Sequence, residues 1–208
     1  MIDDFITKLK KRIDSGLPGS VAHKHMSPSG RITGPFRAND YVQSKKASVL
    51  ILIFRENNVV KFVMIQRPVY NGIHGGQVSF PGGKIEDYDA SPWNAAVRET
   101  EEEIGVKQQE IKYVAELSAL YIPPSNFFVY VFIGYMLGEP VFIPEMKEVE
   151  SVIVAPIEIL LDNTIKNTMD FKRDNIQITV PCYRIQNKNV WGATAIILSE
   201  VEELLRTL

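Results

Sequence analysis

The chain contains 208 residues, of which 45% are hydrophobic, and it carries a formal net charge of −2 at pH 7. This length is enough for one domain with a sizeable buried core. A net charge this close to zero gives no overall basic surface, so we predict neither a nucleic-acid partner nor a membrane partner.

The single cysteine and the composition of the first residues bear on the compartment. Cys182 cannot form an internal disulfide, which fits a reducing compartment, and we expect this thiol to be buried. No apolar run approaches the length of a membrane-spanning helix, and the acidic start at Asp3 and Asp4 differs from a signal peptide. These features predict a cytoplasmic protein.

The N-terminal residues are expected to form a helix followed by an irregular segment. Residues 17–44 are rich in Gly, Pro and Ser, which predicts an extended arm over the surface or a functional loop. His23 and His25 lie there without a third ligand, so we expect a surface role. The chain thus divides into residues 1–46, a helix and arm, and residues 47–208, the domain. The helix, which ends at Gly16, has apolar residues at helical spacing: Ile2, Phe5, Ile6, Leu9 and Ile13.

The central part of the chain alternates aliphatic strands with helices. Residues 47–54 and 59–66 are expected to pair as a hairpin of buried strands, with Glu56-Asn57-Asn58 as the turn between them. This mixed order predicts an α/β (α+β) fold in which helices cover a sheet. The other expected strands cover 111–120, 127–136, 151–154 and 176–185, and the expected helices cover 92–104 and 193–207.

The helix expected at 92–104 has well-marked ends and an acidic side. Ser91 suits the N-cap, Pro92 the first helical position and Gly105 a left-handed C-terminal residue. At about 100° per residue, the carboxylates of Glu99, Glu102 and Glu103 gather on one side of the helix, away from its apolar face. Glu101 points elsewhere.

Two interpretations of this acidic side compete. Like charges three and four residues apart repel one another, and an exposed, solvated acidic face is the simpler explanation. Gly82-Gly83 just upstream favours a metal site instead, because glycine lets the backbone approach closely and hard divalent cations prefer clustered carboxylate and carbonyl oxygens.

The same residues resemble the signature of the Nudix hydrolases, G-x5-E-x7-R-E-U-x-E-E-x-G-U, in which U is aliphatic. The segment from Arg98 to Val106 matches its second half, with Thr100 at an aliphatic position. In the first half, Asp89 stands in place of the glutamate, with one extra residue before Arg98. The resemblance implies an α/β/α sandwich with a mixed β-sheet over residues 47–208 and metal-dependent hydrolysis of a small nucleotide diphosphate.

The segment that precedes the glycine pair is similar to an extra motif of the coenzyme A pyrophosphatase branch, L-L-T-x-R-S-x3-R-x3-G-x3-F-P-G-G. Arg67, Gly76 and the run 80–83 match in register, whereas Ile65, Pro68 and Gly72 replace threonine, serine and arginine. Further agreement comes from 89–91 and 191–195, so the likeness covers most of residues 47–205.

The resemblance to this branch implies cleavage of coenzyme A or an acyl-CoA to 3',5'-ADP and 4'-phosphopantetheine. Two alternatives stay open: hydrolysis of ADP-ribose or a nucleotide sugar, and a catalytically silent nucleotide-binding module. A homodimer is possible.

The expected site residues follow from the helix and the resemblance together. Mg²⁺ or Mn²⁺ is expected on Glu99, Glu102, Glu103 and the Gly83 carbonyl, with Arg98 orienting a glutamate through an ion pair. Arg67, His74 and Gln77 are candidates for contact with substrate phosphates, although a turn-stabilising role fits His74 and Gln77 as well.

The general base is expected outside the signature. Glu145, Glu148 and Glu150 follow a strand, and Glu148 is the preferred base. Glu102, the other catalytic candidate, and Glu103 remain alternatives, and a plain exposed acid is the competing interpretation for Glu148.

Overall fold

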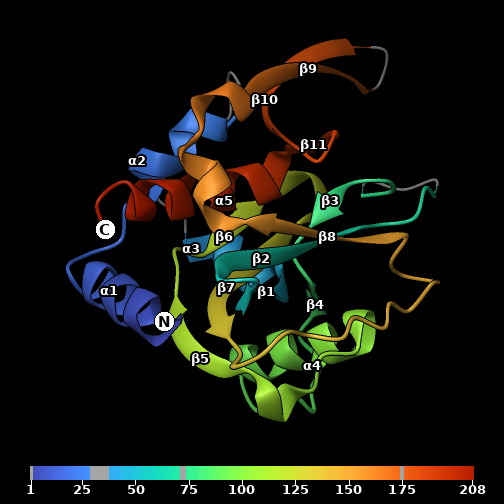
Figure 1. Cartoon of the computed structure of the whole chain (residues 1–208). Coiled ribbons are helices and arrows are strands. Elements are labelled where there is room, and N and C mark those ends of the chain that lie inside the picture. The colour runs from blue at the N-terminus through green and yellow to red at the C-terminus, as the bar shows by residue number, and fades with distance from the viewer. Residues whose placement is uncertain (1, 29–37, 71–73, 174–175) are drawn as a thin grey trace.

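The computed structural model describes residues 2–28, 38–70, 74–173 and 176–208 (Figure 1). The helices are α1 (Ile2–Asp14), α2 (Ser20–His23), α3 (Ala38–Gln43), α4 (Pro92–Ile104) and α5 (Gly192–Leu205). The strands are β1 (Lys45–Glu56), β2 (Val59–Gln66), β3 (Val78–Ser79), β4 (Gly82–Lys84), β5 (Lys112–Glu116), β6 (Leu120–Ile122), β7 (Phe127–Tyr135), β8 (Ser151–Pro156), β9 (Lys166–Arg173), β10 (Ile176–Ile185) and β11 (Lys188–Trp191).

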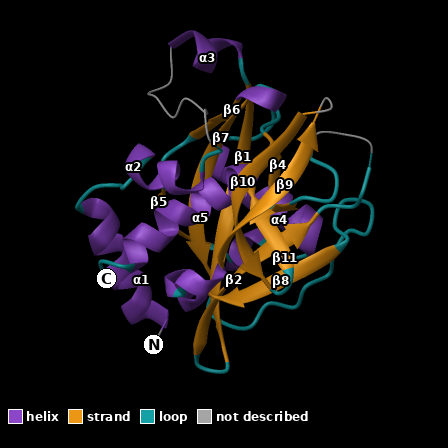
Figure 2. Ribbon diagram, turned by 90° about the horizontal axis from the view of Figure 1, so that it is seen from above, coloured by secondary structure: helices purple, strands orange, loops and turns teal. Residues whose placement is uncertain are grey.

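A mixed sheet of eight strands forms the centre of the molecule, with the path β3-β2-β1-β7-β5. β1 runs parallel to β7 over nine residue pairs, from Lys45–Phe127 to Ile53–Tyr135, whereas β2 and β4 pair with β1 antiparallel. β6 and β8 add to β7 and β2. A separate antiparallel sheet has the order β11-β10-β9. Figure 2 shows α5 lying across the strands of the main sheet.

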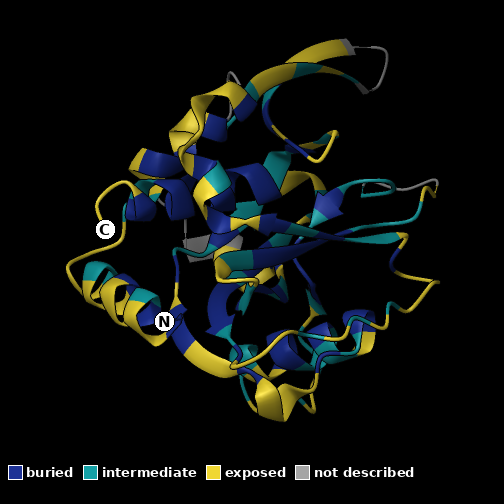
Figure 3. Ribbon diagram, in the orientation of Figure 1, coloured by how far each residue is buried: buried dark blue, intermediate teal, exposed yellow. Residues whose placement is uncertain are grey.

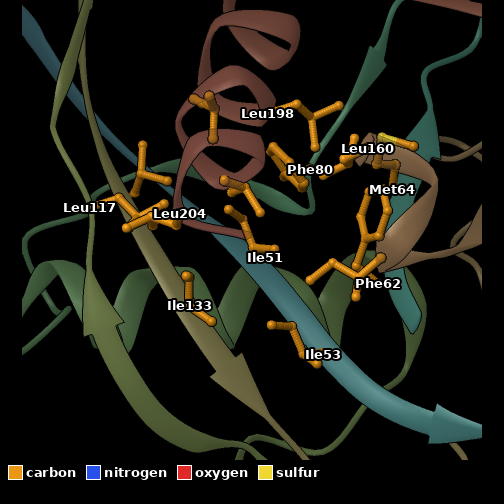
Figure 4. Close-up of a cluster of buried hydrophobic side chains, with 14 of the residues drawn as sticks. Ile51, Ile53, Phe62, Met64, Phe80, Leu117, Ile133, Leu160, Leu198 and Leu204 are labelled. Atoms are coloured by element: carbon orange, nitrogen blue, oxygen red, sulfur yellow. The ribbon is translucent and has the colours of Figure 1, made fainter. Parts of the chain in front are cut away.

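Helices cover both faces of the main sheet, which confirms the predicted mixed α/β fold. Along β1, Ile51 and Ile53 belong to the core beneath α5 and α1, whereas Leu50 and Leu52 belong to the core against α4. Successive side chains point to opposite faces, so a strand buried on both faces appears as a continuous apolar run. Figure 3 shows this central layer as buried, and Figure 4 shows the α5-side core, in which Phe80 lies beside Leu198.

The hairpin predicted between the first two strands is confirmed. Asn57 and Asn58 form its two-residue turn, with φ angles of 50° and 65°, and Glu56 pairs with Val59. Positive φ at both central positions is the geometry that matches the twist of a two-residue hairpin, and asparagine tolerates it better than most residues.

The N-terminal segment packs on α5. Ile2, Ile6 and Leu9 of α1 are buried in the same core as α5, which agrees with the helical spacing of these apolar residues. Short helices, α2 and α3, occur within the segment predicted to be irregular; residues 29–37 lie outside the described residues. The surface role predicted for His23 is wrong, because its side chain is 5% exposed and its Nε2 lies 3.1 Å from Oε2 of Glu200; His25 is exposed.

Several strand boundaries differ from the prediction. The strand expected at 111–120 is divided into β5 and β6, which both pair antiparallel with β7; between them the Leu117 amide donates to the Val131 carbonyl at 2.8 Å. β3, β4, β9 and β11 were not predicted, since they are short or polar. Helices α4 and α5 confirm the predictions to within two residues at each end. Among the described residues, no helix is both long enough and apolar enough to cross a membrane.

Candidate functional site

Two glycines of β4 bring the backbone against β1 on one side and α4 on the other. Gly82 has φ +145°, and a Cβ at this position would lie 2.2 Å from the carbonyl oxygen of Ser48. A Cβ at Gly83 would lie 2.4 Å from Oε2 of Glu99. Any side chain at Gly83 would therefore displace this carboxylate. This agrees with the prediction that the glycine pair lets the backbone approach its neighbours closely.

The ends of α4 fix the direction of its glutamates. Ser91 Oγ accepts a hydrogen bond of 3.2 Å from the Asn94 amide, and Gly105, at φ +77°, donates to the Glu101 carbonyl at 2.9 Å. Thr100 is buried, and its hydroxyl donates to the Ala96 carbonyl at 2.7 Å. A threonine at the aliphatic position thus packs without leaving an unsatisfied polar group.

The glutamates of α4 occupy different environments. Glu103 is buried, and its Oε2 accepts a 2.8 Å hydrogen bond from the Gly82 amide. Glu102 lies farther out, with a side chain 57% exposed. Glu101 lies elsewhere, as expected, and pairs with Lys107 at 2.8 Å. The three glutamates predicted to lie on one side of the helix therefore differ in burial: Glu103 is buried, Glu99 is half-buried and Glu102 is exposed.

Burial sets the protonation of the inner carboxylates. Desolvation raises the pKa of Glu103 to about 7, although Arg67 and the Gly82 amide counteract it, and the charges of Glu99 and Glu148 raise it further. Desolvation also raises the pKa of Glu99, with Glu102 and Glu148 adding to the effect. Such a site favours a proton or a cation beside these carboxylates.

Arg98 joins the acidic residues. Its Nε and Nη2 donate to the two carboxylate oxygens of Asp89 at 2.9 and 3.0 Å, and its Nη1 donates to Glu99 and Glu102, both at 2.8 Å. The hydrogen bonds from Arg98 lower the pKa of Asp89 despite its burial. Nη2 also reaches the Lys84 carbonyl at 3.2 Å, so Arg98 links β4 to α4.

The loop after β7 runs along the C-terminal end of α4. The amides of Ile143 and Glu145 donate to the carbonyls of Ile104 and Glu103, both at 2.9 Å. Glu148 is exposed, and its charge contributes to the raised pKa of both Glu99 and Glu103. Glu150 follows it, and its backbone amide donates to the Gln66 carbonyl at 2.8 Å. The preferred base is thus an electrostatic neighbour of the inner carboxylates.

The three predicted phosphate-contacting residues lie before the glycine pair. Arg67 Nη2 donates to the Gly82 carbonyl at 3.2 Å and lies 3.5 Å from Oε1 of Glu103. His74 Nδ1 lies 3.1 Å from Oε1 of Gln77, and the Gln77 carbonyl accepts from the Arg67 amide at 2.9 Å. These contacts agree with the turn-stabilising alternative for His74 and Gln77. Gly72 lies outside the described residues.

A cavity of about 590 Å³ opens beside the glycine pair. Gly82, Gly83 and the three predicted contact residues are among the residues that line it. Its volume lies within the range of about 300–1,000 Å³ typical of pockets for small molecules and cofactors. A small-molecule ligand that occupies it would therefore lie against both glycines and Arg67.

The family model of the NUDIX domain matches residues 44–173, more than half of the chain. The chain belongs to the Nudix family. Nudix hydrolase 15, mitochondrial, of Arabidopsis thaliana is 32% identical over 166 residues, which cover 76% of this chain and 58% of that relative. The chain therefore spans little more than half the length of this relative.

A bacterial relative and a solved structure agree with this membership. The uncharacterised Nudix hydrolase NudL of Yersinia pestis is 27% identical over 161 residues, 77% of this chain and 79% of that protein. The crystal structure of the Nudix hydrolase RenU from M. smegmatis has a TM-score of 0.53 at 14% identity, covering 79% of this chain and 88% of that one. The structural likeness supports the fold alone.

The donor groups of this Nudix site fit a hard divalent cation, the kind of ion that Nudix hydrolases generally use. Buried carboxylates with raised pKa beside a backbone segment without side chains are the oxygen ligands that such ions prefer. Within the described ranges, no three His, Cys, Asp or Glu side chains converge as in a completed metal site. Protein donors, Arg98 and the Gly82 amide, hold the carboxylates instead.

Two features of the site were not predicted. Asp89 was noted only as a departure from the Nudix signature, but it is the bidentate partner of Arg98, and its position in the signature was the available signal. Phe171 and Trp191 of the smaller sheet also line the cavity, with ring centroids 4.7 Å apart. Only Trp191 belonged to a segment that had been singled out.

Proposed function

We propose that this Nudix protein is a metal-dependent pyrophosphohydrolase acting on a nucleoside diphosphate derivative. The observation that carries the proposal is the convergence of the carboxylates of Glu99 and Glu103 on the Gly82-Gly83 backbone and Arg67, which line a ligand-sized cavity. Mg²⁺ or Mn²⁺ would be held by Glu99, Glu102, Glu103 and the Gly83 carbonyl. Phosphoryl transfer depends chiefly on positioning and charge neutralisation, which these groups supply.

The proposed chemistry assigns each residue a task. A divalent ion here would neutralise charge on the phosphate oxygens and make an attacking water more acidic. Glu148 accepts the proton of this water as the water oxygen attacks one phosphorus. The bond between that phosphorus and the bridging oxygen breaks, and the bridging oxygen leaves on the other phosphate. Arg67 neutralises phosphate charge by hydrogen bonding. Arg98 positions Glu99 and Glu102, and Glu102 is the alternative base.

Coenzyme A or an acyl-CoA is the substrate we favour. The support is the resemblance of 63–83 to the extra motif of the coenzyme A branch, together with 89–91 and 191–195. Cleavage would give 3',5'-ADP and 4'-phosphopantetheine. ADP-ribose or a nucleotide sugar is the second candidate, because Gly72 replaces an arginine of that motif and cannot clamp a phosphate. A silent nucleotide-binding module is the third.

Product analysis tests the activity and the substrate together. Coenzyme A, ADP-ribose and a nucleotide sugar are offered with Mg²⁺ or Mn²⁺ to the wild type, to Glu103→Gln and to Glu101→Gln. Glu101 serves as the matched control, because it lies on the same helix but pairs with Lys107. We expect the two products of coenzyme A cleavage from the wild type and from Glu101→Gln. If ADP-ribose alone is cleaved, ADP-ribose replaces coenzyme A as the assigned substrate. If none of the three compounds is cleaved, the result supports the silent nucleotide-binding module.

The expected setting of the protein also stays a proposal. We propose a cytoplasmic location, a small-molecule nucleotide diphosphate as the partner, and a possible homodimer. The words mitochondrial and chloroplastic in the names of the Arabidopsis relatives describe those proteins. The division into an N-terminal helix and arm, residues 1–46, and a Nudix domain, residues 47–208, is proposed on the same basis.

A further inference from the structure

One face of the small sheet β9–β11 is turned toward the cavity. Phe171 pairs with Ile178 across β9 and β10, and Trp191 pairs with Cys182 across β10 and β11. Paired residues share a face, and so do residues two apart along a strand, which places all of them with Val180 on one side. Of these, Phe171, Ile178, Val180 and Trp191 line the cavity. We call these four residues the apolar wall.

The other face of the same sheet is polar or attached elsewhere. Thr179 and Asp170 pair on this face, and their side chains hydrogen-bond at 2.7 Å on the exposed surface. Farther along β10, the Tyr183 hydroxyl donates to Glu202 of α5 at 2.7 Å. This face is therefore exposed at Thr179 and packed against α5 at Tyr183, while the apolar face remains turned to the cavity. Figure 1 shows this sheet on the side of α5 away from α4.

The cavity has further apolar lining besides the apolar wall. Ile122, Pro123 and Phe127, from β6, the turn after it and β7, also line it. The N-terminus of α5 closes the floor, where the Thr194 hydroxyl donates to the Val78 carbonyl at 2.8 Å. Ile178 of the apolar wall is 37% exposed, so part of this large apolar side chain is in contact with solvent.

The charged side chains that line the cavity come from one segment. Among the described lining residues, the basic side chains are Arg67, His74 and Lys84, all within 67–84, and none of them belongs to β9, β10 or β11. A phosphate group placed against the apolar wall would lose its water without gaining a charged partner, which is costly. An uncharged, elongated group would instead remove the apolar surface of the wall from water.

We propose that the apolar wall is the specificity surface of this site and holds the uncharged, non-nucleotide arm of the diphosphate substrate, while the nucleotide half stays outside it. This inference rests on the proposed pyrophosphohydrolase function and names the half of the substrate that the cavity selects. In a coenzyme A thioester, this arm is the acylated pantetheine chain. The wall therefore favours substrates with a longer acyl group.

Binding of the two halves of the proposed substrate tests this directly, because neither half is turned over. Isothermal titration calorimetry with Mg²⁺ measures the Kd of 4'-phosphopantetheine, its S-hexanoyl derivative and 3',5'-ADP. We expect the hexanoyl derivative to bind at least about tenfold more tightly than 4'-phosphopantetheine, the gain from burying about two methylenes at roughly fourfold each. Equal affinities, or no binding of either pantetheine probe, overturn the proposal.

A pair of variants on β10 separates the wall from the sheet as a whole. Ile178→Asn places an amide on the cavity face, and Thr179→Asn places the same residue on the outer face. We expect Ile178→Asn to bind the hexanoyl derivative no more tightly than 4'-phosphopantetheine, whereas Thr179→Asn keeps the wild-type preference. The affinity for 3',5'-ADP should stay at the wild-type value in both variants. Thermal melts confirm folding, and Phe171→Leu is the milder substitute should Ile178→Asn fail to fold. If Ile178→Asn or its substitute weakens the binding of 3',5'-ADP instead, the wall holds the adenine base and the proposal is wrong.

The proposed function and the proposed role of the apolar wall are contradicted by different results. If coenzyme A and its thioesters are not cleaved but the hexanoyl preference and its loss in Ile178→Asn are observed, the binding assignment stands without the activity. If cleavage is observed and the chain length has no effect on binding or on kcat/KM, the activity stands and the apolar wall has no role in specificity.

Discussion

Arg98 binds both carboxylate oxygens of Asp89, at 2.9 and 3.0 Å, although the two residues lie in different parts of the Nudix signature. This pair fixes the guanidinium so that its remaining nitrogen reaches Glu99 and Glu102. A planar guanidinium offers several donors in a fixed geometry, so one residue orients both glutamates at once. Arg98 is therefore a positioning residue.

Arg98→Lys is expected to lower activity and apparent metal affinity about 10- to 100-fold, the usual effect of losing a group that orients metal ligands. A lysine ammonium cannot bridge Asp89 and the two glutamates together. Metal-activation curves at saturating substrate measure both effects. Lys107→Met removes an exposed ion pair with Glu101 at the end of the same helix and is expected to leave them unchanged. Wild-type metal activation in Arg98→Lys would contradict the positioning role.

Gly83→Ala is expected to reduce kcat about 100-fold, because the added methyl must move the Glu99 carboxylate and small displacements of catalytic groups cost about this much. The free energy of unfolding should change little, since the nearest atoms belong to one flexible side chain. Gly138→Ala is the control for kcat, because a Cβ there meets no atom within 4 Å; its φ of +157° disfavours a side chain, so this variant is expected to lose some stability but to keep the wild-type kcat. Kinetics together with denaturant unfolding separate the two effects, and a wild-type kcat in Gly83→Ala would rule out a tight fit at this point.

Much of the main sheet was predictable from continuous apolar stretches of the sequence. β1, β2 and β7 are buried on both faces, so their sequences are continuously aliphatic and leave little choice of element. β9 has a polar sequence and gains its strand conformation from pairing with β10, which no local pattern reveals. β4, with two glycines, is a strand only because β1 lies beside it.

The candidate site was predictable where helical spacing determines neighbours and not where distant segments meet. The side of α4 that carries Glu99 and Glu103 follows from its periodicity. The burial of His23 depends on Glu200, 177 positions away, and the apolar wall depends on the smaller sheet lining the same cavity as the glycine pair. Neither relationship leaves a local signal in a single sequence.

Glu148→Gln is expected to lower kcat by about 100-fold or more, the usual contribution of a general base. The acidic limb of the pH–rate profile should disappear with it, because this limb reports protonation of the base. Glu145→Gln and Glu150→Gln are the matched controls from the same loop and should retain near wild-type rates. A comparable loss in either control, with Glu148→Gln near wild type, would transfer the role of base within the loop.

Glu200 provides a pH-dependent contribution to stability far from the glycine pair. Burial alone would raise the pKa of Glu200, but hydrogen bonds from His23, Ser118 and the Gly19 amide outweigh it, so the pKa lies below its ordinary value of 4.5. A carboxyl whose pKa is lowered on folding stabilises the folded state above its unfolded pKa. This contribution is lost as the pH falls below 4.5 and through the folded pKa.

Glu200→Gln should therefore destabilise the protein by about 2 kcal/mol at pH 7, the scale of a hydrogen-bonded charged group. The difference from the wild type should shrink as the pH falls below 4.5, because the wild-type carboxyl is then protonated as well. Urea unfolding at a series of pH values measures this difference. Glu203→Gln, a less buried acid on the same helix, should show no such trend. A difference that stays constant down to pH 3 would mean that packing alone, and not the charge of Glu200, stabilises this contact between the N-terminal segment and α5.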